Sequence, residues 1–510
     1  MPVSVLYGSS RLGASIETRE PPKCFHDLNL DQVIAAVTAG RESYDLTPIF
    51  HSPLPHVVSI RYRQEVFRDF ERSEVRVHVT WFAERMRAVR EALAVEGKLY
   101  YALQQQRWHL DAVAEYCEAV NGLANRLGAS ELRSEGLRAL RNGLDGYTHS
   151  TQFQSLCAET EGLQADLAGI AYTVRIHGKR VEVARYDGEG DYAAEVLETF
   201  GKFRQGAVEP RAFSFRSASE MNHIEAAILE RVAALHREVF RRLAEYCERH
   251  RDFRDPLVLD FDRGAQFFLA WLEFLAPLKK AGLRFCYPDV SERTDAIRGF
   301  EMFDLALAHQ VVVEGGQVVV NDFELHDPER ILVVSGANQG GKTTFARAIG
   351  QMHYLATLGC PVPGREAHLS RIDQVLTHFE REEHVETLRG KLENSLERMR
   401  VILELATARS LLIMNESFDA TTVSDALYLN RWILGQVMRR DLLCVCVTFL
   451  DELASLSRKT VSFVAEVDAE DPSKRTFKVV KRPAEGLAHA MAVARKHRLT
   501  YEQIKERIGS

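Results

Sequence analysis

The residues with the clearest chemistry form one short run, residues 336–343 (GANQGGKT), which matches G-x-x-x-x-G-K-[ST] at each fixed position. Glycines in such a loop let backbone N–H groups turn inward around an anion, and the following helix adds positive potential at its N-terminus. We therefore predict an ATP-binding loop in which Lys342 contacts the β- and γ-phosphates and Thr343 gives its hydroxyl to Mg²⁺. The predicted nucleotide-binding residues are Gly336, Ala337, Asn338, Gln339, Gly340, Gly341, Lys342, Thr343 and Thr344.

The residues on both sides of this run have the pattern that the motif requires. Residues 331–334 (ILVV) are typical of a buried strand, and residues 343–359 (TTFARAIGQMHYLATLG) have a helical pattern. A strand, a loop and a helix in this order are the setting of a phosphate-binding loop. A chance glycine-rich turn is the alternative, and it is disfavoured because motif and setting agree.

A second apolar run, residues 410–414 (SLLIM), ends in Asn415 and Glu416, as a strand that carries catalytic carboxylates does. Glu416 is predicted to polarise or deprotonate the attacking water. Asn415 stands where an Asp usually assists the metal, and its amide oxygen accepts a hydrogen bond from Mg²⁺-bound water but brings no charge. We expect Thr343 and Asn415 at the metal and a slow ATPase. The alternative is an ordinary polar strand end in a domain that hydrolyses nothing.

A third predicted strand, residues 442–448, is followed by Phe449, where many ATPases have a histidine that senses the γ-phosphate. Cys444 and Cys446 lie two apart in this strand, so both thiols point to one face and are predicted to be small buried hydrophobes. The spacing of the eight cysteines matches no zinc or disulfide pattern, which favours a reducing cytoplasm.

These motifs belong to a chain of 510 residues, 46% of them apolar, which is enough for several domains with real cores. The N-terminus lacks the charged and apolar regions of a signal peptide, and no apolar stretch reaches the length of a membrane helix, so we expect a cytoplasmic protein with no membrane partner. The net charge is -7. Any binding to nucleic acid must therefore use a local patch or a groove formed by two chains.

The pattern along the chain divides it into three zones. The first two dozen residues are polar and predict a tail. From residue 27 to about 289 helical periodicity dominates, interrupted where residues 165–186 alternate polar and apolar on both sides of residues 177–179, which predicts a β-hairpin. Near residue 300 short β-branched runs begin, which predicts an α/β domain.

Four segments together resemble the ATPase domain of the MutS mismatch-repair family. They are SGANQGGKTTFARAIGQMHYLATLGCPVPG, RIDQVLTHFER, MNESFDATTVSDALYL and EGLAHAMAVARKHRLTYEQIKERI. Upstream, LDQVIAAVTAGRESYDLTPIF and IRYRQEVFRDFE resemble the start of the MutS core. The resemblance covers residues 28–510, most strongly the last 200 or so.

The resemblance implies a multidomain fold: an all-α core and lever with a small β-hairpin, then an α/β P-loop ATPase domain of ABC type and a C-terminal helix-turn-helix. The implied domains are an N-terminal tail (1–26), core and lever (27–298), ATPase domain (299–484) and a dimerising helix-turn-helix (485–510). In the family a serine signature reaches the nucleotide of the partner subunit. Ser395 and Glu397 lie near that position here, and which residue aligns with the signature serine is left open.

The resemblance further implies a homodimeric clamp that binds duplex or branched DNA in repair or recombination, driven by ATP, with repair proteins as further partners. We expect no direct mismatch reading, because few residues precede the core and none form the family's Phe-x-Glu wedge; no nuclease domain follows the ATPase. Arg175, Lys179 and Arg180 in the hairpin are the candidate DNA contacts, with a solvated loop as the alternative reading.

One functional alternative is a nucleotide-dependent switch or scaffold that holds a protein partner with little hydrolysis. Salt-dependent DNA binding separates it from the clamp. An ABC- or SMC-like ATPase outside the MutS group is disfavoured, because the sequence contains no LSGGQ-like signature and no extended heptad arms.

Overall fold

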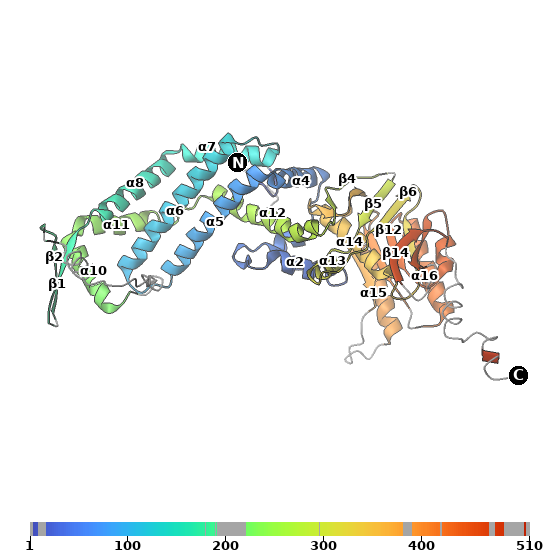
Figure 1. The fold of residues 1–510 in the computed structure, drawn as a ribbon. Helices are drawn as coiled ribbons and strands as arrows, with labels where there is room; N and C mark the ends of the chain where they lie inside the picture. The colour runs from blue at the N-terminus through green and yellow to red at the C-terminus, as the bar shows by residue number, and fades with distance from the viewer. Residues whose placement is uncertain are drawn as a thin grey trace, which may run out of the picture. The chain divides into compact units, whose positions relative to one another are not determined.

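The computed structural model describes residues 4–8, 17–178, 180–188, 190, 221–294, 296–380, 390–418, 421–468, 475–483 and 504–505. Within them the chain forms two compact units (Figure 1). The first contains residues 1–72, 133–138 and 263–510, and the second contains residues 73–132 and 139–262. One unit is largely helical and the other contains an α/β sheet, so the mixed fold class is confirmed at that level. The domain limits stay predictions, and almost all of the predicted helix-turn-helix lies outside the described residues.

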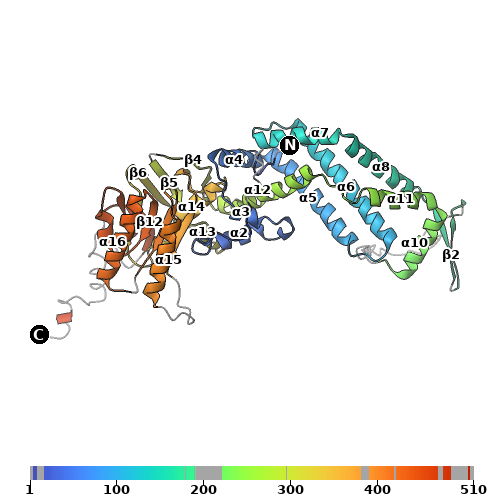
Figure 2. The ribbon, with the colours of Figure 1, turned by 180° about the vertical axis from the view of Figure 1, so that it is seen from behind.

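Long amphipathic helices build the second unit. Helices α5 (Ser73–Glu96) and α6 (Ala102–Ala129) run side by side (Figures 1 and 2). They bury apolar residues at three- and four-residue spacing, as the periodicity predicts. The other helices of this unit are most of α7 (Glu135–Thr148), α8 (Thr151–Ala168), α10 (His223–Leu235) and α11 (Arg237–Arg249).

The predicted β-hairpin is confirmed in the same unit. Strands β1 (Tyr172–His177) and β2 (Arg180–Arg185) pair in antiparallel fashion. Val174 lies opposite Val183, and Arg175 lies opposite Glu182. Because side chains alternate along a strand, one face of the hairpin is apolar and the other is polar.

Aromatic side chains form the core of the helical part of the first unit. Its helices are α2 (Leu30–Thr38), α3 (Thr47–His51), α4 (Val57–Glu71) and most of α12 (Pro256–Lys280), with a single 3-10 turn at Glu42–Tyr44. Phe267 and Phe268 of α12 are fully buried, and both rings contact Phe67 of α4. Among the described residues, no helix is both long and apolar enough to cross a membrane.

The start of the chain differs from the polar tail that its composition predicts. Val5, Leu6 and Tyr7 are buried. The fully buried Arg63 of α4 donates from Nε to the backbone oxygen of Leu6 over 3.1 Å, and from Nη1 to that of Leu358 over 2.9 Å. The apolar run is too short to predict a core element from sequence, and its position depends on these contacts with residues far along the chain.

A mostly parallel sheet forms the centre of the α/β part. Among the described residues it has six strands, in the order β10-β11-β12-β7-β13-β14. Strand β14 pairs antiparallel with β13 and the other pairs are parallel. The strands are β10 (Val375–Phe379), β11 (Leu411–Asn415), β12 (Leu443–Val447), β7 (Ile331–Gly336), β13 (Thr460–Val467) and β14 (Arg475–Lys481). The central strands are continuous apolar runs, as expected for strands covered on both faces.

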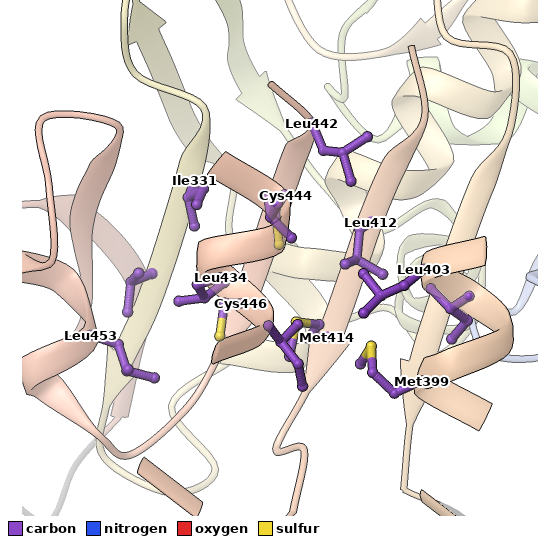
Figure 3. Packing of buried hydrophobic residues seen from close by; sticks show 14 of the residues in the cluster. Ile331, Met399, Leu403, Leu412, Met414, Leu434, Leu442, Cys444, Cys446 and Leu453 are labelled. Atoms are coloured by element: carbon purple, nitrogen blue, oxygen red, sulfur yellow. The ribbon is translucent and has the colours of Figure 1, made fainter. Parts of the chain in front are cut away.

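Helices α15 (Lys391–Leu405) and α16 (Val423–Arg439) cover one face of this sheet. Figure 3 shows the packed cluster there, with Leu412 and Met414 of β11 beside Met399 and Leu403 of α15. Cys444 and Cys446 of β12 are buried in the same cluster, as predicted for small hydrophobes. The cluster also contains Ile331, Leu434, Leu442 and Leu453.

Helix α14 (Lys342–Thr357) covers the other face, and the N-terminal segment packs against it. A Cβ on Gly350 would lie 2.6 Å from the end of the Ile413 side chain and 2.8 Å from that of Leu28, so both side chains pack closely on this glycine. The backbone oxygen of Leu28 accepts a hydrogen bond from Gln351 over 2.8 Å, and that of Asp27 accepts one from Arg347 over 2.8 Å. The segment just before α2 is thereby held against the helix that follows the phosphate-binding motif.

Smaller elements complete this unit. A sheet of order β4-β9-β5-β6 and the short pair β3-β8 lie in the described part of the chain. Their bounds, with those of the remaining helices, are β3 (Phe285–Cys286), β4 (Asp289–Ser291), β5 (Ala296–Met302), α13 (Leu305–Val313), β6 (Asn321–His326), β8 (Val362–Pro363), β9 (Glu366–Ser370) and a 3-10 turn at Asp451–Ser455.

Candidate functional site

The predicted phosphate-binding loop lies between β7 and α14, as its sequence setting requires. Gly336, Gln339 and Gly341 have positive φ angles of 110°, 60° and 90°. A Cβ on Gly336 would lie 2.8 Å from the backbone oxygen of Ala465, so only glycine fits there. The loop therefore curls back at the end of the strand and enters α14 at Gly341, which precedes Lys342 at the helix N-terminus.

The side chain of Lys342 folds back into this loop. Its ammonium donates to the backbone oxygen of Gly336 over 2.8 Å and to Oδ1 of Asn338 over 3.2 Å. Oε1 of Glu416 lies 3.9 Å away. Burial lowers the pKa of Lys342, and the nearby carboxylate of Glu416 opposes that shift. A buried cation held at the centre of a curled loop is an arrangement suited to an anion such as a phosphate group.

Thr343 and Asn415 meet across the gap between α14 and β11. The Thr343 hydroxyl donates to Oδ1 of Asn415 over 2.8 Å. Hydroxyl and amide oxygens are hard ligands of the kind Mg²⁺ accepts, and this ion keeps several waters and binds largely through substrate phosphates. No cluster of three or more His, Cys, Asp or Glu suited to a metal occurs among the described residues. The two side chains fit a metal that arrives with a nucleotide, better than a metal held by the protein alone.

Glu416 follows directly after the last residue of β11. Its backbone N–H donates to the oxygen of Val447 on the adjacent strand over 2.9 Å, and its φ angle is 50°. The side chain is 39% exposed, so its carboxylate reaches solvent beside Lys342. A partly exposed carboxylate at this place can orient or deprotonate a water molecule.

The cavity beside this loop has a volume of about 730 Å³. Predicted residues on its wall are Asn338, Gln339, Gly341, Lys342, Thr343, Thr344 and Glu416. Its other wall is mainly apolar and was missed by sequence reasoning: Leu307, Val311, Val318, Val319 and Phe477, with Asp304, Gln317 and Asn321 as its polar members. These residues come from segments far from the motif, and no local signal identifies them.

Phe477 is the most distinctive of the missed residues. It lies on β14 with a φ angle of 58°, and 48% of its surface is exposed. A Cβ on Gly341 would lie 3.7 Å from its side chain, in ordinary contact. Two residues earlier on the same strand, Arg475 donates from Nε to the backbone oxygen of Asn338 over 3.0 Å. Strand β14 thus places an aromatic ring and a cation next to the phosphate-binding motif.

Other predicted residues do not line the cavity. The Ser395 hydroxyl is 3.2 Å from Nε2 of His378, and Glu397 pairs with Arg400 on its own helix. Ala337 is buried in the loop, where its backbone oxygen accepts from Gly340 over 3.2 Å. Phe449 follows β12 and is 49% exposed. A role for Ser395 and Glu397 toward a partner's nucleotide stays a prediction.

The candidate DNA contacts lie on the hairpin of the second unit. The register puts Arg175 and Arg180 on one face, together with Glu182, so the local charge is only modestly positive. Lys179 lies outside the described residues. DNA contact by Arg175, Lys179 and Arg180 stays a prediction.

The chain is similar to known proteins mainly in its C-terminal part. Residues 332–506 match the family model for MutS domain V. Over 209 residues the chain is 29% identical to the Endonuclease MutS2 of Gemmatimonas aurantiaca, covering 39% of this chain and 25% of that protein. Over 257 residues it is 26% identical to the DNA mismatch repair protein MutS of Thermotoga neapolitana, covering 50% of this chain and 30% of that protein. The chain thus spans less than a third of the length of these relatives.

Proposed function

We propose that this MutS-related chain, whose residues 332–506 match MutS domain V, is a DNA-binding ATPase of DNA repair or recombination. The observation that carries the proposal is the convergence of Lys342, Thr343, Asn415 and Glu416 beside one cavity. These four side chains come from the two segments that the sequence singles out for phosphate and water chemistry. ATP with Mg²⁺ is the proposed ligand.

In the proposed reaction, different residues bind the phosphates, bind the metal and activate the water. Backbone N–H groups of the loop and the N-terminus of α14 hold the phosphates, and Lys342 exchanges its contacts with loop oxygens for contacts with phosphate oxygens. Thr343 and Asn415 would hold Mg²⁺ together with the phosphates, and the ion, when bound, would supply neutralisation of phosphate charge. Glu416 orients the attacking water and takes its proton.

The amide at Asn415 makes this ATPase slow. An amide oxygen accepts the hydrogen bond from Thr343, as a carboxylate would, but it adds no negative charge near the cation. Metal binding in the reacting complex is weaker as a result. The proposed protein therefore spends most of its time with nucleotide bound and hydrolyses it infrequently.

The apolar wall of the cavity suits the base of the nucleotide. Phe477 offers an aromatic face that can stack on a purine, with Leu307 and Val318 among the aliphatic neighbours. A pocket with one polar, cationic wall and one apolar wall fits a nucleoside triphosphate better than inorganic phosphate.

On the DNA side, the proposal is a homodimeric clamp whose ATP cycle changes its grip on duplex or branched DNA. It is supported by the names of the relatives, which are a mismatch repair protein and an endonuclease of the MutS group. Arg175 and Arg180 on the hairpin are proposed to contact the phosphate backbone of DNA. Lys179, which lies between them in the sequence, is proposed to do the same. Repair proteins are proposed as further partners.

The second candidate function is a nucleotide-gated scaffold for a protein partner. The specific observation in its favour is Asn415, since loss of the carboxylate suits a protein that binds ATP without rapid turnover. In this case the hairpin cations are a solvated surface, and the switch lies in nucleotide binding and release.

One experiment separates the two. ATP hydrolysis by the purified chain is measured with linear, mismatched and four-way-junction DNA, and without DNA, at low and physiological salt. Glu416→Gln serves as the blank for contaminating ATPases. Stimulation by any DNA supports the clamp and ranks its substrates, whereas ATP binding with no DNA response at low salt favours the scaffold. No ATP binding at all contradicts both.

A further inference from the structure

The residues just after β11 form a strained turn. Glu416 and Phe418 have φ angles of 50° and 65°, in a region that residues other than glycine seldom adopt. Such backbone persists only where its surroundings hold it. Ser417, between them, is buried. The place of the Glu416 carboxylate therefore depends on what holds this turn.

His378, at the fourth position of β10, is one of the groups that hold it. Its Nδ1 lies 2.8 Å from the Ser417 hydroxyl, and its Nε2 lies 3.1 Å from the backbone oxygen of Ser395 on α15. The Ser395 hydroxyl is 3.2 Å from the same nitrogen. We assign the ring proton to Nε2, because the carbonyl oxygen of Ser395 can only accept a hydrogen bond from it. In the neutral ring Nδ1 is then the acceptor, and the Ser417 hydroxyl donates to it.

The ring is neutral near pH 7. It is 1% exposed, and burial, with the charge of Arg398 acting in the same direction, lowers the pKa of His378 to about 4. Each ring nitrogen therefore has a single role, one as donor and one as acceptor. These two roles set the direction in which hydrogen bonds are donated, from Ser417 to His378 and from His378 to Ser395.

Further contacts tie the same groups together. The His378 ring stacks on Phe418, with ring centres 5.5 Å apart. Arg398 of α15 donates to the backbone oxygen of Phe379 over 3.0 Å, which adds a second bond between α15 and β10. From the other side, Asn430 of α16 donates to the backbone oxygen of Ser417 over 3.3 Å. His378 is the group that joins the turn to α15.

We propose that His378 is a positioning residue for hydrolysis, which holds the Glu416 turn in a fixed relation to α15 through Ser417 and Phe418. The inference rests on the proposed ATPase function. His378 does not line the cavity, whereas Lys342, Thr343 and Glu416 do. Loss of its contacts shifts Glu416 but leaves the phosphate-binding loop intact. A shift of about 1 Å at a catalytic group lowers a rate by up to roughly 100-fold.

The test uses variants that separate the two ring nitrogens. Ser417→Ala removes the hydroxyl that donates to Nδ1. His378→Gln keeps a polar group near the place of Nε2 and loses Nδ1, whereas His378→Asn keeps an acceptor near the place of Nδ1. Ser410→Ala is the matched control: Ser410 is also buried, at the opposite end of the same apolar run, where its hydroxyl donates to Asp373 over 2.9 Å.

Turnover and nucleotide affinity are measured for each variant at a temperature where all are folded. We expect Ser417→Ala and His378→Gln to lower kcat by about 10- to 100-fold with ATP affinity unchanged. His378→Asn should recover most of kcat, and Ser410→Ala should keep it. Wild-type kcat in Ser417→Ala, or a parallel loss of affinity and kcat in both variants, overturns the proposal.

Amide hydrogen exchange of residues 416–418 separates failure of this inference from failure of the ATPase assignment. We expect faster exchange there in Ser417→Ala and His378→Gln than in the wild type and Ser410→Ala. Unchanged exchange in both variants overturns the role of His378 whatever the activity. If wild-type turnover equals that of Glu416→Gln, the ATPase assignment is wrong, and the exchange result alone decides whether His378 holds the turn.

Discussion

The hydroxyl of Thr343 donates a hydrogen bond to the side-chain oxygen of Asn415 over 2.8 Å. This bond joins the first turn of α14 to the end of β11, so the two segments that carry the proposed chemistry are in direct contact. An asparagine oxygen accepts this bond as well as an aspartate oxygen does. The difference between the two residues is therefore charge, which makes position 415 a direct test of the metal's role.

Asn415→Asp should raise Mg²⁺-dependent turnover. The carboxylate retains the bond from Thr343 and adds a negative charge near the cation, which strengthens Mg²⁺ binding by on the order of 1 kcal/mol. Titration of ATP hydrolysis with Mg²⁺ should show half-maximal activity at a lower Mg²⁺ concentration. An unchanged Mg²⁺ dependence means that another step limits turnover.

Lys342→Ala should abolish high-affinity nucleotide binding. Removal of a charged donor to phosphate loses about 2 to 3 kcal/mol, or roughly 100-fold in Kd. The measurement is equilibrium binding of a fluorescent ATP analogue. Lys280→Ala, at the exposed end of α12, is the control and should bind normally. Unchanged affinity in Lys342→Ala contradicts the phosphate-loop assignment.

Glu416→Gln should bind ATP and hydrolyse it about 100-fold more slowly, as expected for loss of a general base. The amide keeps the size of the side chain but accepts no proton from water. Single-turnover hydrolysis with trapped nucleotide measures this step directly. Glu452→Gln, an exposed carboxylate in the turn after β12, is the matched control. Equal single-turnover rates for Glu416→Gln and the wild type remove Glu416 from the mechanism.

Phe477→Ala should weaken ATP binding by about 1 to 3 kcal/mol, the usual contribution of an aromatic ring stacked on a base. Because Phe477 lines only the apolar wall, hydrolysis of bound ATP should be little affected. Phe477→Tyr keeps the ring and should bind ATP normally. Affinity for inorganic triphosphate, which has no base, should be the same in all three proteins. An equal loss of affinity for triphosphate would falsify the base-stacking role.

Arg175→Ala combined with Arg180→Ala should weaken DNA binding and reduce its salt dependence. Each phosphate contact contributes about one unit to the slope of log K against log salt, so the double variant should lose about two. Fluorescence anisotropy at several salt concentrations measures the slope. Arg241→Ala is the control, because Arg241 pairs with Glu238 and Glu245 on α11. The same slope in the double variant and the wild type places DNA binding elsewhere.

The polar half of the candidate site could be predicted from sequence because it is local. The glycines, Lys342 and Thr343 lie within one loop, and Asn415 and Glu416 end one apolar run, so spacing and strand pattern identify them. The apolar half could not. Phe477 enters the cavity wall through the pairing of β14 with β13, which no short-range pattern specifies.

The fold shows the same division between local and long-range information. Helical periodicity and the alternation around residues 177–179 predicted the long helices and the hairpin, both of which are present. Burial of Val5, Leu6 and Tyr7 was not predicted, because three apolar residues become core only through contact with Arg63 and its neighbours. The link from Ser417 through His378 to Ser395 was likewise missed, since it joins three separate elements.

The packing of Leu28 and Asp27 on α14 also has a consequence for how the protein is made. The ribosome completes this N-terminal segment long before it reaches α14, and the whole second unit is synthesised in between. Until α14 has been synthesised, residues 27 and 28 lack the surface on which they pack and are accessible to chaperones and proteases. A fragment that begins at residue 299 lacks Leu28, which packs against Gly350 and accepts a hydrogen bond from Gln351. We therefore expect the α/β part to be more stable when residues 27–50 are present, in the same chain or as a separate peptide.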